Sequence, residues 1–417
     1  MAEVKVANGA SAPLRNRATA IIFLGAALGT TGLFAAFSLG PIVAVQITGS
    51  DGTAGLPGAA AVLGVAVGAF FLSAIMARSG RGPGLATGYG IGAVGAALVV
   101  FSIERSSFSI VLVGMLLIGA AHASNQLARF AAADMHPPER RGIVLSWIVW
   151  AGTIGAILGP GSLEFLKGPT RSLGLDPIAG GFVAGGILFV IALMACVVGL
   201  RGPAIRALAD DGSTVEPISK TALLPMLRLP HARLALVVAV AAQMSMVSVM
   251  TMTPLHIRHS GVGLGSVGLV MSAHFAGMFG LAPVAGKLNA RFGTTPVMLA
   301  GGAMLVLASS LAAAIPAHSA LLLMIPLLSL GVGWSLCFVA ASALLTRDLS
   351  YKERARLQGG VESIVWASSA VASVGSGAVV AWAGFPELCL IAAMVALFAI
   401  IFAWSQRGIL VAPGSTI

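Results

Sequence analysis

The stretch 134–140, DMHPPER, recurs as DLSYKER at 348–354, and this repetition is the strongest indication of the fold. Both copies begin with an aspartate and end with a Glu-Arg pair. Outward from these copies, other positions match at a constant spacing of 213 residues, namely Pro41 with Pro254, Ser73 with Gly286, Arg78 with Arg291, and Gly80 with Gly293. An internal repeat of this length predicts two structurally similar halves.

The composition indicates that these halves lie in a lipid bilayer. Hydrophobic residues make up 58% of the 417 residues, charged residues only 9%, and the mean hydropathy is +0.98. A membrane-crossing helix needs about 20 mainly apolar residues, so the chain has room for about twelve. We therefore expect an all-α membrane protein with twelve transmembrane helices in two six-helix halves. The expected spans are 18–47, 58–77, 84–103, 108–128, 142–165, 178–200, 234–257, 265–288, 296–315, 320–345, 358–381 and 388–404.

These spans divide the chain into two halves, a linker and two tails. The segment between the halves is polar and contains several prolines, which favours a cytoplasmic linker. The predicted segments are an N-terminal tail at 1–17, the first half at 18–200, the linker at 201–233, the second half at 234–405 and a C-terminal tail at 406–417.

The basic residues are distributed unequally between the two sides of the membrane. Of the 24 lysines and arginines, all but Arg105, Lys167, Arg171 and Arg258 fall on the side of the N-terminus. The positive-inside rule therefore predicts a multi-pass membrane protein with both termini in the cytoplasm. This topology accounts for the net charge of +10, so we expect the lipid bilayer and no nucleic acid as a partner.

Two consecutive spans carry side chains that bind soft or borderline metal ions. Met246 and Met250 are four residues apart in one span, and His274 and Met278 have the same spacing in the next. Residues four apart share one face of an α-helix, so each helix presents a pair of ligands. A rise of about 1.5 Å per residue puts Met250 near the depth of His274, and Met246 near that of Met278. The pattern predicts a path for a metal ion.

Copper in the Cu(I) state is the cargo that these ligands favour, because thioethers and neutral imidazoles are soft or borderline donors. Met252 and His256 are secondary candidates for binding or coupling, on the span that contains Met246 and Met250. Acidic residues are absent from five predicted spans, 18–47, 58–77, 108–128, 234–257 and 265–288. Glu362 is therefore a candidate for coupling to an ion gradient. The open alternative is that the methionines only fill space in the core.

Twelve spans in two halves, with a long central linker, resemble the major facilitator superfamily, in which the substrate site lies between the halves. A loop signature of that superfamily appears after the second and eighth spans around Arg78 and Arg291, with alanine in place of its aspartate. By resemblance, Arg78 would pair with Asp134 and Arg291 with Asp348 as gating contacts. Span 142–165 also resembles a glycine-proline motif of proton-coupled exporters, although closely spaced glycines equally favour tight helix packing.

The paired motifs Met246-xxx-Met250 and His274-xxx-Met278 further resemble the CcoA-like copper importers, the CalT family of the superfamily. The resemblance implies copper import by alternating access across the bacterial cytoplasmic (inner) membrane. It also implies supply of copper for assembly of the cbb3-type cytochrome oxidase. Copper would be the substrate and not a permanently bound cofactor, and a cytoplasmic copper chaperone is the implied protein partner.

Two other functions stay open from the residues alone. His122, Asn125 and Arg129 form a polar stripe within two turns of one span, which would suit a proton-coupled transporter or exporter of a small organic solute or drug. A membrane scaffold for oxidase assembly is the other alternative, and a measured flux would exclude it. An enzyme is not expected, because the spans contain no nucleophile, base and orienting group in a recognisable arrangement.

The predicted topology can be tested with reporter fusions. Alkaline phosphatase fused after Ile417 should be inactive and green fluorescent protein fused there should fluoresce, because the C-terminus is expected in the cytoplasm. Phosphatase fused after Arg105 is the control and should be active. Active phosphatase at the C-terminus would contradict the predicted orientation.

Overall fold

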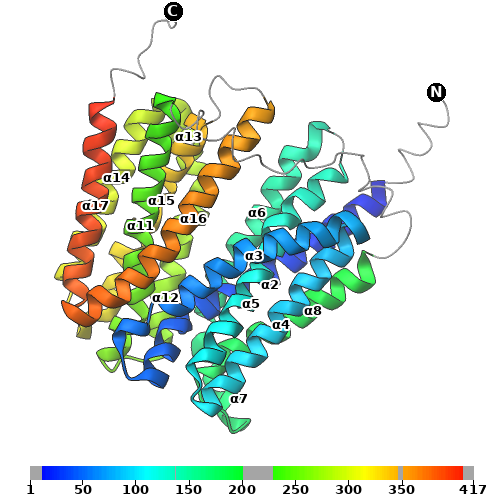
Figure 1. The fold of residues 1–417 in the computed structure, drawn as a ribbon, viewed down its shortest axis with the longest axis horizontal. Coiled ribbons are helices and arrows are strands. Elements are labelled where there is room, and N and C mark those ends of the chain that lie inside the picture. Colours follow the sequence, from blue (N-terminus) through cyan, green and yellow to red (C-terminus); the bar gives the residue numbers. More distant parts are fainter. Residues whose placement is uncertain (1–11, 137, 201–228, 346–350, 407–417) are drawn as a thin grey trace, which may run out of the picture. The chain divides into compact units, whose positions relative to one another are not determined.

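The computed structural model describes residues 12–136, 138–200, 229–345 and 351–406. Long helices dominate each described range (Figure 1). In the first part of the chain the α-helices are α2 (Ala12–Thr48), α3 (Leu56–Ser79), α4 (Arg81–Arg105), α5 (Phe108–Asp134), α6 (Pro138–Gly161), α7 (Leu163–Ser172) and α8 (Ala179–Gly199). In the second part they are α11 (Pro230–His259), α12 (Leu264–Phe275), α13 (Ala282–Phe292), α14 (Thr294–Ala314), α15 (Met324–Leu345), α16 (Tyr351–Trp382) and α17 (Phe385–Ser405).

Within the described ranges, eleven helices are long and apolar enough to cross a membrane. Two further helical pieces, Leu264–Gly280 and Ala282–Phe292, meet at a bend of 40° and together have the length and composition of a twelfth span. In lipid, helices satisfy their own backbone hydrogen bonds, which explains why apolar sequence of this length folds in this way. The predicted all-α membrane fold is confirmed, with the eighth predicted span broken rather than continuous.

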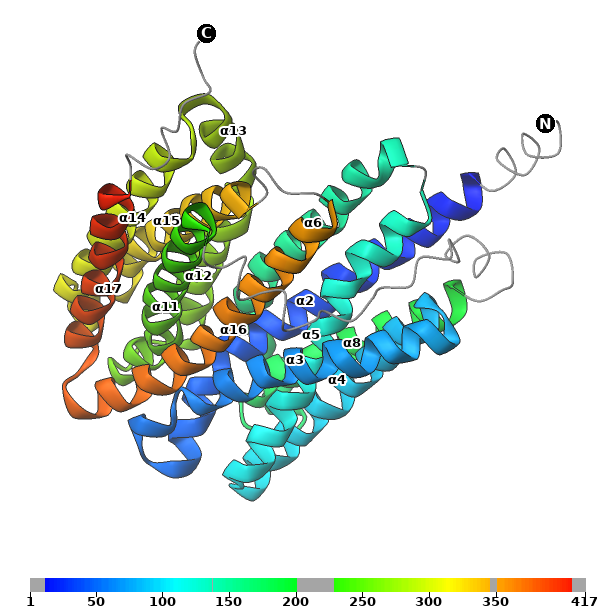
Figure 2. The same ribbon diagram turned by 45° about the horizontal axis from the view of Figure 1, so that its top comes forward.

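The contacts divide the chain into two compact units. The first contains Met1–Thr48 and Ala60–Val215, and the second contains Gly49–Ala59 and Glu216–Ile417. In the first unit α2 packs against α5, α6 and α8, while α4 packs against α5 and α8. In the second, α11 packs against α15, α16 and α17, and α14 lies against α15 and α17 (Figure 2).

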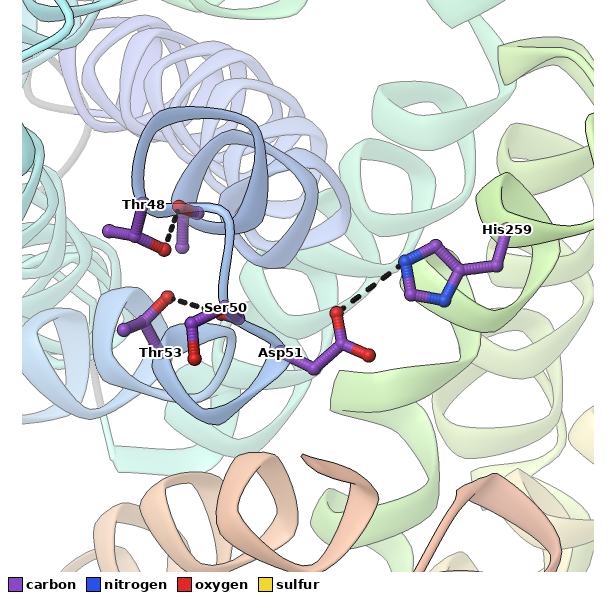
Figure 3. Close-up of polar contacts among 6 residues, drawn as sticks. Thr48, Ser50, Asp51, Thr53 and His259 are labelled. Atoms are coloured by element: carbon purple, nitrogen blue, oxygen red, sulfur yellow. Dashed lines mark hydrogen bonds and ion pairs between the residues drawn. The ribbon is translucent and has the colours of Figure 1, made fainter. Parts of the chain in front are cut away.

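The short segment 49–59 belongs to the second unit although it follows α2 in the sequence. It contains the 3₁₀ turn η1 (Asp51–Thr53), which packs on α16. The Ser373 hydroxyl donates a buried hydrogen bond of 2.7 Å to the carbonyl oxygen of Gly55. Asp51 Oδ1 lies 3.5 Å from His259 Nε2 at the end of α11 (Figure 3). These contacts fix the segment on the second unit.

Glycines allow helices within each unit to touch through their backbones. A Cβ atom added at Gly155 or Gly159 of α6 would collide with the carbonyl oxygens of Ala27 or Thr31 on α2. Small residues permit this close approach. In lipid the hydrophobic effect does not drive helices together, because lipid tails are as apolar as the helix surfaces, so close packing contributes more to their association. The glycine-rich stretch of α6 therefore serves packing, in agreement with the packing interpretation of the exporter-like motif.

A pair of substitutions on α6 tests this packing. Gly155→Ala should lower the free energy of unfolding by about 1–3 kcal/mol, because the new methyl group meets the α2 backbone. Gly152→Ala is the matched control, since its Cβ would lie 3.7 Å from Thr30 Oγ1, an ordinary contact. Thermal unfolding of the detergent-purified proteins measures both. Equal melting temperatures for the two variants would contradict the packing.

Candidate functional site

His274 on α12 has the most distinctive environment among the predicted metal ligands. Its side chain is completely buried, with 0% exposure, and its Nδ1 lies 2.8 Å from the carbonyl oxygen of Leu327 on α15. A carbonyl oxygen can only accept, so Nδ1 carries the proton. Nε2 then presents a lone pair, and this buried atom has no hydrogen-bond partner among the described residues. A neutral imidazole held in this way is typical of histidines that bind metals.

Met278 lies in a different kind of helix from His274. Residues Ala276–Gly280 form a π-helical segment, η2, between α12 and α13, and Met278 within it is 6% exposed. The expectation that His274 and Met278 share one face assumed a continuous α-helix. A π-helical turn inserts extra backbone and changes the angle between them, so simple α-helical spacing does not describe this pair.

Met246 and Met250 lie on α11, which is helical throughout Pro230–His259. Met246 is 2% exposed and Met250 is partly buried. Because the helix is regular, these two side chains share a face, as predicted. Met252 is fully buried two residues further on, so it lies on a different face of α11. The helices α11 and α12 contact each other, and both contact α15. Coordination of one ion by all four predicted ligands remains a prediction.

His256 lies near the end of α11, away from His274 in the sequence. Its ring stacks on Phe385 of α17, with ring centroids 4.1 Å apart and an angle of 16° between planes. Its Nε2 is buried and has no hydrogen-bond partner within the described ranges. The stacking accounts for the orientation of this ring, and a role for His256 in binding remains a prediction.

A buried polar network in the second unit was not anticipated from the sequence. Gln243 of α11 donates from Nε2 to the Ser369 hydroxyl over 2.8 Å and accepts from Trp334 Nε1 over 2.6 Å. Trp334 also stacks on Phe338, with centroids 4.9 Å apart, and meets Phe279 edge-on at 6.1 Å. A sequence signal existed, because Gln243 is an isolated amide in an apolar helix.

The first unit contains a comparable network that includes one of the predicted residues. Asn125 accepts a 2.9 Å hydrogen bond from the Tyr89 hydroxyl and donates one of 3.2 Å to Thr30 Oγ1. Thr30 precedes Gln243 by the same 213 residues that separate Pro41 from Pro254. His122 and Arg129 are partly buried on the same helix and interact electrostatically. Asn125 is thus tied into the unit's own helices.

Comparison with known proteins identifies the family. Residues 19–265 and 235–408 each match the model of the Major Facilitator Superfamily. The chain belongs to this superfamily. It is 32% identical over 398 residues to the uncharacterised MFS-type transporter YdeG of Bacillus subtilis (strain 168), covering 94% of this chain and 93% of that one. It is 28% identical over 384 residues to the riboflavin transporter RfnT of Brucella anthropi, covering 89% and 93%.

A solved structure shows the same fold with little sequence similarity. The chain matches a bacterial homologue of the human lysosomal transporter Spinster with a TM-score of 0.75 and 14% identity, covering 95% of this chain and 97% of that one. Major Facilitator Superfamily proteins are transporters and not enzymes, so the chain is a membrane transporter. The names of these relatives do not mention copper, and the CcoA-like specificity therefore stays a prediction.

The gating pairs expected for a superfamily member are only partly described. Arg78 is exposed at the end of α3, and Arg291 is exposed on α13 with its guanidinium 5.2 Å from the ring centroid of Phe292. Asp134 ends α5, but its side chain lies outside the described part, and Asp348 lies outside the described residues altogether. Both pairs stay predictions.

Glu362, the candidate for ion coupling, is exposed on α16. A second carboxylate near a span, Glu164 of α7, forms an ion pair of 2.6 Å with Lys167. The coupling role of Glu362 stays a prediction.

A double-mutant cycle tests the Gln243 network of this transporter. Gln243→Leu should lower stability by about 1–3 kcal/mol, because it leaves the buried Trp334 Nε1 donor without its acceptor. It also removes the amide donor to the Ser369 hydroxyl, which keeps its own bond to the Val365 carbonyl oxygen. Combined with Trp334→Phe, the losses should be less than additive, with a coupling of about 0.5–3 kcal/mol. Unfolding of the purified variants measures each value. Strict additivity would show that the two side chains do not interact.

Proposed function

We propose that this transporter imports copper across the bacterial cytoplasmic membrane by alternating access. His274, Met246, Met250 and Met278 are the proposed cargo ligands. The observation that carries the proposal is the state of His274. Its Nδ1–H group donates to the Leu327 carbonyl oxygen, while the buried Nε2 has no hydrogen-bond partner in the part of the chain that the structure describes. An unpaired buried nitrogen costs free energy, and binding of a metal ion offsets that cost.

The ligand chemistry supports Cu(I) over harder cations. Three thioethers and one neutral imidazole carry no charge and need no deprotonation before they bind. Uncharged ligands can remain in an apolar interior between transport cycles, whereas free carboxylates there would be costly. Met246 and Met278 are largely buried in the second unit, which suits transient binding away from water.

The proposed direction and destination follow the resemblance to the CcoA-like importers. Copper entering the cytoplasm would be passed to a copper chaperone and used in assembly of the cbb3-type cytochrome oxidase. The ion is cargo in this scheme, so no permanently bound cofactor is required.

Uptake or export of a small organic solute is the second candidate function. It is supported by the similarity to RfnT, whose name describes a riboflavin transporter, and by the aromatic and amide cluster of Trp334, Phe338 and Gln243. Stacked rings with a nearby amide suit a planar solute that also forms hydrogen bonds. In the first unit, Arg129 and His122 would provide a charge and a proton acceptor, as the sequence suggested.

The two functions predict opposite sensitivities in transport assays. Met250→Leu and His274→Asn should each lower the initial rate of radioactive copper uptake by about tenfold or more, since each removes a ligand. Leucine keeps the volume of methionine without its sulfur. Asparagine can still donate toward Leu327 but lacks the Nε2 lone pair. Uptake is measured in cells with matched protein levels and in proteoliposomes.

Met298→Leu is the matched control, because Met298 is a buried methionine on α14 that is not a proposed ligand. This variant should transport copper at the wild-type rate. Normal copper uptake by both ligand variants would refute the proposal. Riboflavin uptake that depends on Trp334 or Arg129 and tolerates Met250→Leu would instead establish the organic-solute function.

A further inference from the structure

Two glycines bring the backbone around His274 into direct contact with α15. A Cβ added at Gly277 would collide with the carbonyl oxygen of Leu328 and lie 3.1 Å from the amide nitrogen of Val332. A Cβ added at Gly331 would collide with the carbonyl oxygen of His274 and lie 2.8 Å from the amide nitrogen of Met278. The contact therefore contains one glycine from η2 and one from α15, and there is no room for a side chain at either position.

This contact lies beside the hydrogen bond that orients the histidine. His274 bonds to the carbonyl oxygen of Leu327, and the next residue, Leu328, provides the oxygen that faces Gly277. The separation of the two backbones at the glycines thus sets the distance from the imidazole to its acceptor. Hydrogen bonds weaken steeply when this distance or angle changes, so a shift of a few tenths of an ångström matters.

The π-helical segment η2 begins two residues after His274 and includes both Gly277 and Met278. Segments of this kind are rare and occur frequently at functional sites, where an added residue redirects a side chain. The segment packs on α15 along the same stretch. The glycine contact therefore supports a local geometry that ordinary α-helix would not adopt.

We propose that Gly277 and Gly331 are positioning residues that hold His274 and Met278 in the geometry for binding the cargo ion. This inference rests on the proposed function, because it assigns the glycines a role at the same site. The backbone contact keeps the Nδ1–H group of His274 donating to the Leu327 carbonyl oxygen and leaves Nε2 available. Loosening the contact frees the ring to change its tautomer or orientation.

The test uses Gly277→Ala and Gly331→Ala with two controls. Gly280→Ala alters the same π-helical segment at a position where an added Cβ would meet no described atom of a neighbouring helix within 4 Å. Gly333→Ala introduces a tight contact on α15, 2.9 Å from the Gly301 carbonyl oxygen on α14, and does not meet His274. The second control separates general crowding of α15 from displacement of the histidine.

The first measurement is the nitrogen NMR signal of His274 in full-length protein labelled with ¹⁵N-histidine, without metal. The signal is assigned by its loss in His274→Asn. The wild type, Gly280→Ala and Gly333→Ala should show the tautomer with the proton on Nδ1. Gly277→Ala and Gly331→Ala should lose that signature. A wild-type spectrum with the proton on Nε2 would overturn the inference even if neither glycine variant folds.

The second measurement is the concentration dependence of copper uptake in proteoliposomes. Gly277→Ala and Gly331→Ala should raise the KM for Cu(I) by about tenfold or more with a smaller change in maximal rate, as expected for a displaced supporting contact. Both controls should keep the wild-type KM. Unchanged KM and unchanged NMR signal in folded glycine variants would refute the positioning role. If the wild type carries no copper, the proposed function fails, and the NMR result still decides whether the glycines position His274.

Discussion

Close contact between helix backbones is the constraint on which both units depend. In lipid, the hydrophobic effect does not drive one apolar helix toward another, so packing and hydrogen bonds must hold the bundle together. The glycines of α6 against α2 and Gly331 of α15 against η2 show the same solution in different units. Removing side chains at these points lets the rest of each helix pack at short range.

The same constraint makes precise placement of a buried polar group possible. His274 depends on a carbonyl oxygen of a neighbouring helix, and that oxygen is within reach because the two backbones touch. Gln243 likewise reaches partners on two other helices from the centre of α11. Each network fixes side chains of the second unit without using a charged residue.

The sequence predicted the fold well because the information is distributed along the chain. Hydropathy predicted the number of spans and the internal repeat predicted two similar halves. Both signals depend on many residues, so no single position decides them. The π-helical segment η2 and the bend that follows it were missed, because Gly277 and Gly280 are compatible with several backbone conformations. Nothing local in HxxxM distinguishes a π-helical turn from an α-helical one.

The candidate site was predicted less completely than the fold. Met246 and Met250 lie on one regular helix, as their spacing required, and His274 is buried as its place in an apolar span suggested. The bond from His274 to Leu327 joins residues 53 positions apart, and the Gln243 network joins helices far apart in sequence. Such contacts depend on tertiary packing, which a single sequence does not display.

X-ray absorption spectroscopy of the purified transporter loaded with Cu(I) under reducing conditions tests the central claim most directly. The account predicts sulfur scatterers together with one imidazole nitrogen, and loss of the imidazole contribution in His274→Asn. A spectrum that lacks sulfur, or one that is identical in the wild type and in His274→Asn, would contradict it.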